Sequence, residues 1–176
     1  MEPSSLACDQ LEKRLTALRI ASLELVQNVS LDSLLQRIGA IACEQLNAGA
    51  AAIGVVNEKA QKIQFTLVCQ GENQTPTVEF AAGEDFAKST QTVHTNQIPV
   101  EISSRLFPNL ESGVVSLLGV PLFRTNKILG QIYLVNKIPG DQFTSEDRLL
   151  LETFGCYAAA ALYHALLYTR LSLREL

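Results

Sequence analysis

Three segments in the second half of the chain decide the fold, and they read SLLGVPLF over residues 116–123, ILGQIYLVNK over 128–137 and FTSEDRLLLETFGCYAAAALYHALLY over 143–168. The first two are rich in apolar, β-branched and aromatic residues, as strands typically are. They predict strands over Val114–Phe123 and Ile128–Lys137, joined at Arg124–Lys127, where Asn126 favours a tight turn. Because Pro121 has no backbone N–H, we expect a bulge or a sheet edge beside it.

The third segment predicts a long final helix. Thr144 can serve as its N-cap, and Asp147 stands three residues later, where the acid of a capping box lies. The apolar run from Phe154 to Leu167 is interrupted by His164 and is shorter than the roughly 18 residues of a membrane span. No stop signal follows, so we expect the helix to reach the end of the chain and to continue in a longer protein.

Upstream, two further strands are expected over Ala51–Asn57 and Ile63–Cys69, with a turn at Glu58–Gln61. The first of these strands is rich in Ala and Gly. We interpret Gly54 in it as a sign of tight packing between a helix and the sheet, with close approach of a ligand as the alternative.

The segment Gly71–Ser112 is predicted to be irregular, with a short helix over Glu84–Thr95 and a brief strand over Ile98–Ile102. Segments of this kind often carry binding function on a rigid scaffold.

The N-terminal part predicts two helices. The second covers Leu31–Leu46, with Ser30 as N-cap, an apolar face wide enough to pack on a sheet, and stop residues at Asn47–Gly49. In the first, seven residues follow the alternating three- and four-residue spacing of a coiled-coil seam: Cys8, Leu11, Leu15, Leu18, Ser22, Leu25 and Val29.

The order of these elements places a block of strands between helices. It predicts an α+β fold with a central antiparallel sheet of about five or six strands, helices on one face, and long N- and C-terminal helices. The sequence shows no βαβ alternation and no glycine-rich phosphate-binding loop.

Composition argues against several functions. Lys and Arg total 14 against 18 Asp and Glu, and the net charge of −4 argues against a nucleic-acid partner. The N-terminus lacks the cationic start of a signal peptide, and the four cysteines are scattered without a CxxC pair. We therefore expect a cytoplasmic protein with reduced, mostly packed cysteines. No metal-ligand spacing and no catalytic Ser-His-Asp set is visible.

The three opening segments, together with SLDSLLQRIGAIACEQLNA (30–48) and AAAIGVVN (50–57), resemble a GAF domain over Leu31–Arg170. The resemblance implies a central antiparallel sheet with helices packed on one face and a pocket on the other. It divides the chain into an N-terminal coiled-coil-like helix (1–30), the GAF domain (31–170) and the start of a C-terminal output helix (171–176).

One part of the resemblance is a more specific sequence motif. Some GAF domains that bind cyclic nucleotides carry an N-K…F…D-E pattern, and this chain matches it at four positions, with Arg148 in place of the final Glu. We expect a salt bridge between the Lys and the Asp to hold a strand–helix corner above the Phe, in a structural role, and cyclic nucleotides stay open as ligands. The matching residues are Asn136, Lys137, Phe143 and Asp147.

Other relatives bind chromophores or act on thiols. The loop Ser103–Ser112 lacks the Cys and His that attach bilin or bind haem in relatives, so neither cofactor is expected. His94 is expected to cap the middle helix or lie at the surface near the pocket, and His164 to face solvent or a dimer seam. The cysteines do not cluster as in free-methionine-sulfoxide reductases, so we predict a protein that is not an enzyme.

The resulting hypothesis is a ligand-sensing GAF module of a signalling protein, such as a histidine kinase of a two-component system or a cyclase. It would form a parallel homodimer through its terminal helices and signal to an effector domain in the same full-length chain. A small-molecule ligand would lie between the sheet and Gly83–Ser112. From position alone, the wall candidates are Phe86, Thr90, Leu106, Phe107, Leu117 and Tyr133.

The alternative is a dimerisation or spacer module that binds nothing. Relatives often have a GxxGxVxxTG pattern in the middle segment, whereas this chain reads GEDFAKSTQTVHTNQ over residues 83–97. Ala87 and Asn96 replace two of the glycines, so the backbone approach to a ligand that those glycines allow is missing.

Overall fold

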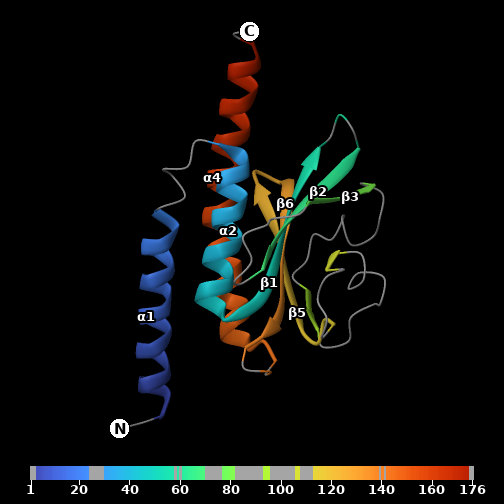
Figure 1. Cartoon of the computed structure of the whole chain (residues 1–176). Helices are drawn as coiled ribbons and strands as arrows, with labels where there is room; N and C mark the ends of the chain where they lie inside the picture. The colour runs from blue at the N-terminus through green and yellow to red at the C-terminus, as the bar shows by residue number, and fades with distance from the viewer. Residues whose placement is uncertain are drawn as a thin grey trace.

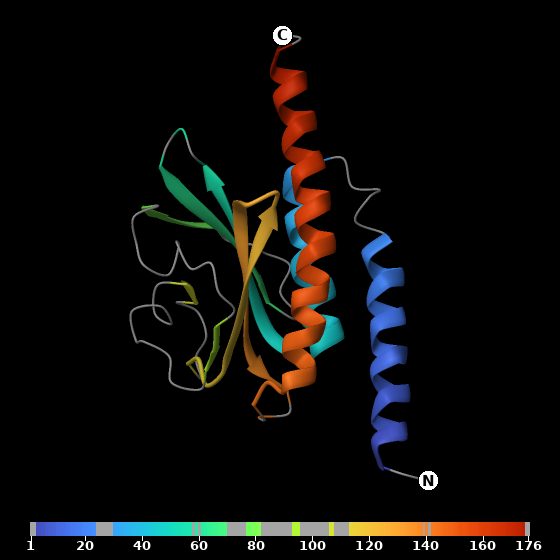
Figure 2. The same cartoon turned by 180° about the vertical axis from the view of Figure 1, so that it is seen from behind.

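The computed structural model describes residues 3–23, 30–57, 59, 61–69, 77–81, 93–95, 106–107, 113–138, 140 and 142–174. A twisted sheet forms one layer, α2 and α4 lie against one of its faces, and α1 lies outside these two helices (Figures 1 and 2). In chain order the elements are α1 (Pro3–Leu23), α2 (Leu31–Leu46), β1 (Ala48–Asn57), β2 (Lys62–Cys69), β3 (Thr77–Ala81), β4 (Val93–Thr95), β5 (Leu117–Arg124), β6 (Lys127–Lys137) and α4 (Ser145–Arg174).

The sheet has six strands in the order β3-β2-β1-β6-β5-β4, and every neighbouring pair is antiparallel. The central pair joins β1 to β6, with Ala52 opposite Tyr133 and Ile53 opposite Ile132. This arrangement confirms the predicted α+β fold with helices on one face.

Two strands lie where the sequence predicted none. Both β3 and β4 fall in the segment expected to be irregular, and β4 occupies Val93–Thr95, the last residues of the helix predicted over Glu84–Thr95. That prediction is wrong at these three residues because they pair with β5, with Val93 opposite Gly119 and Thr95 opposite Leu117. The rest of that helix and the strand predicted over Ile98–Ile102 lie outside the described residues.

The hairpin between β5 and β6 closes as predicted. Thr125 and Asn126 have φ of 50° and 63°, so both central residues adopt the left-handed backbone that a two-residue type I′ turn requires. The bulge expected beside Pro121 is also present, between Leu122 and Phe123. The extra residue lies on the partner strand: Leu122 pairs with Gly130 and Phe123 with Ile128, and Leu129 stands between them.

The helix caps also follow the sequence. The Ser33 N–H donates to Ser30 Oγ over 3.1 Å at the start of α2, and Asn47 closes that helix with φ of 52°. At the start of α4 the Asp147 N–H donates to Thr144 Oγ1 over 3.2 Å, and the Thr144 N–H donates to Asp147 Oδ2 over 2.9 Å. The reciprocal bonds of a capping box are therefore complete, with Asp in place of Glu.

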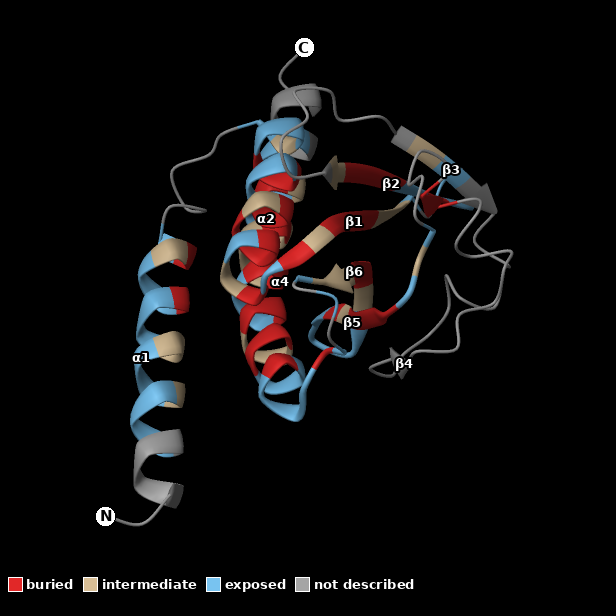
Figure 3. Cartoon of the chain, turned by 60° about the horizontal axis from the view of Figure 1, so that its bottom comes forward, coloured by how far each residue is buried: buried red, intermediate tan, exposed pale blue. Residues whose placement is uncertain are grey.

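The apolar side chains form two clusters, one on each face of the sheet. The larger cluster joins α1, α2 and α4 to the strands, and Figure 3 shows the buried sides of these helices turned toward each other and the sheet. By length and composition, α4 over Ser145–Thr169 would suit a membrane span. Its apolar residues have a place in the core, however: Leu150, Leu151, Phe154, Ala158 and Leu162 are all buried there.

The predicted seam of α1 packs against the chain's own helices. Leu18 and Ser22 are buried, and Leu11 and Leu15 are half-buried against the larger cluster, whereas Cys8 is exposed. The remaining seam positions, Leu25 and Val29, lie outside the described residues. In this structure the stripe is therefore covered by α2 and α4 of the same chain.

Candidate functional site

The corner between β6 and α4 is built around one buried carboxylate. The Asp147 side chain is 1% exposed, and the ammonium group of Lys137 lies 2.9 Å from it. Lys137 also donates to the carbonyl oxygen of Leu46, at the end of α2, over 2.8 Å. The expected Lys137–Asp147 salt bridge is thus present, and it also joins the corner to α2.

Arg14 of α1 is a third partner of this corner that the sequence analysis missed. Its guanidinium donates to Asp147 over 3.0 Å and reaches Glu146 over 3.4 Å. Sequence spacing gives no signal for this contact, because Arg14 and Asp147 lie 133 residues apart. The Lys137 side chain is only 13% exposed, so solvent screens its ion pair with Asp147 less than it screens a surface pair.

The pKa of the Asp147 carboxyl reflects these contacts. Burial raises it, but the Thr144 N–H, Lys137 and Arg14 together outweigh burial and hold the pKa below its ordinary value. The carboxylate is therefore charged at neutral pH and can hold both cations.

Asn136 fixes the chain on the other side of the corner. It adopts a left-handed backbone with φ of 59°, and its Oδ1 accepts from the Val115 N–H over 2.7 Å. Its Nδ2 donates to the Gly113 carbonyl over 2.8 Å. Phe143 is buried, and the Lys137 ammonium lies 5.9 Å from its ring centre. These contacts connect the end of β6 to the residues just before β5 and to those just before α4.

The opposite face of the sheet holds the described members of the predicted pocket wall. Four of them are buried in the smaller cluster: Leu106, Phe107, Leu117 and Tyr133. Leu106 and Phe107 reach it from the segment between β4 and β5, and the other two lie on β5 and β6. The two remaining wall candidates, Phe86 and Thr90, lie outside the described residues.

Aromatic rings fill the space above two glycines on this face. A Cβ on Gly54 would lie 2.6 Å from Cε1 of Phe65, and one on Gly119 would lie 2.5 Å from Cδ1 of Tyr133. The interpretation of Gly54 as a helix contact is therefore wrong, because the ring of a neighbouring strand occupies its free side. Tight helix–sheet packing occurs instead at Gly39 of α2, where a Cβ would lie 2.6 Å from Cγ2 of Val68.

One polar pair lies on the same apolar face. The Tyr133 hydroxyl donates to Gln131 Oε1 over 2.9 Å, and both side chains are buried. Burial raises the pKa of the Tyr133 phenol well above its ordinary value, so it stays protonated and can donate. Two of the rings on this face, those of Phe65 and Tyr133, lie 5.9 Å apart between centres at an interplanar angle of 42°.

The sequence profile of the GAF domain family matches residues 28–162, more than half of the chain. The chain belongs to the GAF domain family. GAF domains are sensory and regulatory modules of signalling proteins.

Solved GAF domains share the fold at low sequence identity. The GAF domain of a phosphoenolpyruvate-protein phosphotransferase from Acinetobacter superposes with a TM-score of 0.69 at 19% identity, covering 94% of this chain and 96% of that one. The corresponding domain from Coxiella burnetii gives 0.70 at 21%, covering 88% and 95%. The GAF-B domain of DevS from Mycobacterium smegmatis gives 0.61 at 16%, covering 80% and 98%.

The remaining candidate residues of this GAF domain are its cysteines and histidines, and they lie on different elements. Cys43 is buried in α2, but Cys8 and Cys156 are exposed, so the prediction that the cysteines are mostly packed is wrong for those two. His94 belongs to β4 and not to a helix, and His164 is exposed on α4 beside Tyr163. Within the described ranges, no group of three His, Cys, Asp or Glu side chains could hold a metal ion.

Proposed function

We propose that this GAF domain is a cytoplasmic sensor of a small molecule that dimerises and signals through α4 to an effector domain of the same full-length chain, of the histidine kinase or cyclase type. The observation that carries the proposal is the smaller cluster, which faces away from the helices. Two of its residues, Leu106 and Phe107, come from the segment that was predicted to cover a ligand. A ligand there would contact β5 and β6, and β6 leads into the Lys137–Asp147 corner at the start of α4.

The output helix carries an apolar surface suited to pairing. Among the α4 side chains that the structure describes, the exposed large apolar ones are Leu149, Tyr157, Leu167 and Tyr168. Tyr157 and Tyr168 stand 11 residues apart, about three helical turns, so they share one side of the helix. Because the seam of α1 is covered within the chain, we propose that α4 contributes more of the dimer interface than α1.

The spacer alternative has an observation of its own. The rings of Phe65 and Tyr133 occupy the space above Gly54 and Gly119, which are the points where a ligand could otherwise approach the sheet backbone. A domain with this face permanently filled would dimerise and transmit force without sensing. Neither proposal includes catalysis, since Cys8, Cys43 and Cys156 lie on three different helices and Cys69 ends β2.

Native mass spectrometry, with an absorbance spectrum, on protein purified gently from its own host separates the two proposals. The sensor predicts a dimer with a reproducible extra mass. A dimer with no bound mass that also fails to bind cyclic nucleotides and small metabolites would favour the spacer. A monomer at high micromolar concentration in sedimentation would contradict both, because each requires pairing of the helices.

A further inference from the structure

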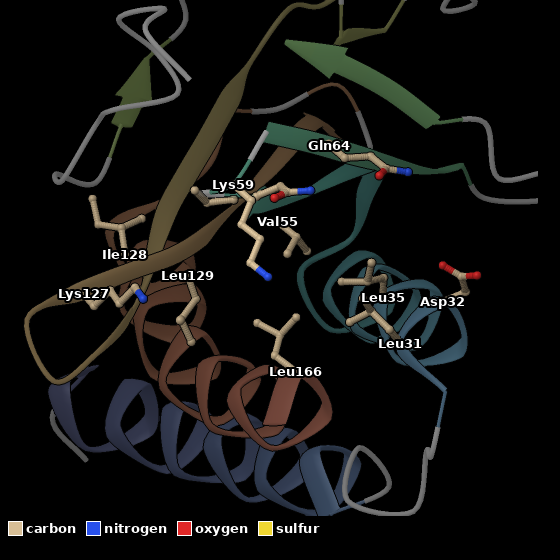
Figure 4. Close-up of a pocket in the computed structure, with 12 residues that line it drawn as sticks. Leu31, Asp32, Leu35, Val55, Lys59, Gln64, Lys127, Ile128, Leu129 and Leu166 are labelled. Atoms are coloured by element: carbon tan, nitrogen blue, oxygen red, sulfur yellow. The ribbon is translucent and has the colours of Figure 1, made fainter. Parts of the chain in front are cut away.

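A groove lies on the helix-covered side of the sheet, at the end where β1 finishes and β6 begins. Its volume is about 430 Å³, within the roughly 300–1,000 Å³ typical of small-molecule sites. The apolar lining comes from four elements: Leu35 of α2, Val55 of β1, Leu129 of β6 and Leu166 of α4 (Figure 4). Leu129 is the extra residue of the β-bulge, which turns it toward the helices.

A second cavity of about 310 Å³ continues the groove along α4. The two share Lys127, Leu129 and Leu166, so they form one trough. The second cavity adds Arg124 and Tyr163, and the Arg124 guanidinium lies 4.9 Å from the centre of the Tyr163 ring. The trough therefore offers an elongated apolar floor with a cation at its far end.

Positive charge gathers around this trough although the chain carries a net charge of −4. Among the described lining residues, three side chains are cationic (Lys59, Lys127 and Arg124) and one is anionic (Asp32). Figure 4 shows the ammonium groups of Lys59 and Lys127 directed toward the space between the leucines, with Asp32 at the opposite edge. An apolar floor with cations at the rim is complementary to an apolar molecule that carries one negative group.

We propose that this trough binds an alkyl carboxylate of medium length. The alkyl chain would lie on Leu35, Leu129 and Leu166, and the carboxylate would pair with the ammonium groups of Lys59 and Lys127. The site is separate from the smaller cluster on the other face of the sheet, so the inference goes beyond the proposed sensor and does not depend on it.

The position of the trough gives such a ligand a direct effect on α4. Leu166 belongs to both cavities, whereas none of the described α4 side chains belongs to the cluster on the opposite face. A ligand in the trough would contact α4 together with α2, and would stabilise the arrangement in which these helices and the β5–β6 hairpin are packed. Binding here therefore regulates the output helix without passing through the sheet.

The test is a titration of the full chain, with leucine methyl groups labelled for NMR, by decanoate below its micelle concentration. Two probes serve as controls: decyltrimethylammonium has the same chain with the opposite charge, and acetate has the charge without the chain. We expect saturable shifts of the methyls of Leu35, Leu129 and Leu166 with decanoate, and at least roughly 5-fold weaker binding of either control probe. Shifts confined to Leu67, Leu106 and Leu117 would place the ligand on the opposite face and overturn the proposal.

A charge-reversal variant tests the role of the lysines. Lys59→Glu with Lys127→Glu should raise the Kd for decanoate roughly 5-fold or more, because two attractions become repulsions. Lys13→Glu, on the exposed side of α1, is the matched control and should leave the Kd unchanged within about 2-fold. Equal affinity of the wild type and the double variant, with both folded by circular dichroism, would also overturn the proposal.

Discussion

The two faces of the sheet are packed in different ways. On the helix-covered face, fully buried side chains such as Leu34, Ile38 and Phe154 come from helices and meet the strands across long sequence distances. On the opposite face, the residues come from strands and from Leu106 and Phe107, and rings lie over glycines within the sheet itself.

The difference in packing suggests different roles for the two faces of the sheet. Removing a helix from the first face would expose a large apolar surface, so that face fixes the fold. On the second face, movement of one ring, such as that of Phe65 or Tyr133, would open space above the sheet backbone. The same strands therefore pack against helices on one face and against aromatic rings on the other, and variants on each face test whether the two packings differ in stability.

The largest effect is expected at Phe154, in the centre of the helix-covered face. Phe154→Ala should lower the free energy of unfolding by about 3–5 kcal/mol, since the side chain is fully buried and leaves a cavity. Urea unfolding followed by circular dichroism measures this loss. Phe123→Ala, at a ring that is 42% exposed, is the control and should cost much less; equal losses would contradict the conclusion that the helix-covered face fixes the fold.

The next effect is expected at the corner between β6 and α4. Asp147→Asn should cost about 2–3 kcal/mol, because it leaves Lys137 and Arg14 without their carboxylate in a partly buried setting. Glu152→Gln removes an exposed pair with Arg148 and should cost only about 0.3–0.5 kcal/mol in the same urea experiment. Similar losses for both variants would show that the corner contributes no more than a surface ion pair.

The pH dependence of stability tests the same carboxylate. Because folding lowers the pKa of Asp147 below its unfolded value of 3.8, the ionised group stabilises the fold above about pH 4. That contribution is lost as the pH falls toward the folded pKa. The stability gap between wild type and Asp147→Asn should therefore narrow as the pH falls below about 4 in urea titrations; a gap independent of pH would contradict the ionic role.

A smaller effect is expected on the opposite face. Gly119→Ala should cost about 1–3 kcal/mol, because the new Cβ meets the Tyr133 ring and must displace it. Gly155→Ala on α4 is the comparison: its Cβ would lie 3.3 Å from Cγ2 of Val120, and the gain in helix propensity offsets the contact. If Gly119→Ala loses no stability in thermal unfolding, the ring above it moves freely and the face is open to a ligand.

Of the two variants on the opposite face, Tyr133→Phe is expected to have the smaller effect. The variant removes the hydroxyl that donates to Gln131 while keeping the ring, and should cost about 0.5–1.5 kcal/mol. Urea unfolding at pH 7 measures this cost. A larger loss than that of Gly119→Ala would mean that the polar pair, and not the packing of the ring over glycine, holds this face together.

Much of the fold could be predicted because it depends on local chemistry. The caps at Ser30 and Thr144, and the turn at Asn126, use residues whose side chains or backbone preferences act within four positions. The sequence did not predict β4, because its three residues form a strand only by pairing with β5. For the candidate site, the Lys137–Asp147 pair followed from the family pattern, but the trough around Leu129 left no signal.

The α+β class, the strand–helix corner and the apolar stripe of α1 could be predicted from the sequence alone, since periodicity and capping are properties of neighbouring residues. The contacts that these features make follow from the packing of the folded chain. In the folded chain, the apolar stripe of α1 packs against α2 and α4, and Arg14 meets the carboxylate of Asp147, 133 residues away. Leu129 points into the trough, whose lining it shares with Leu166. Such contacts depend on how distant elements meet, and one sequence carries no local pattern that specifies them.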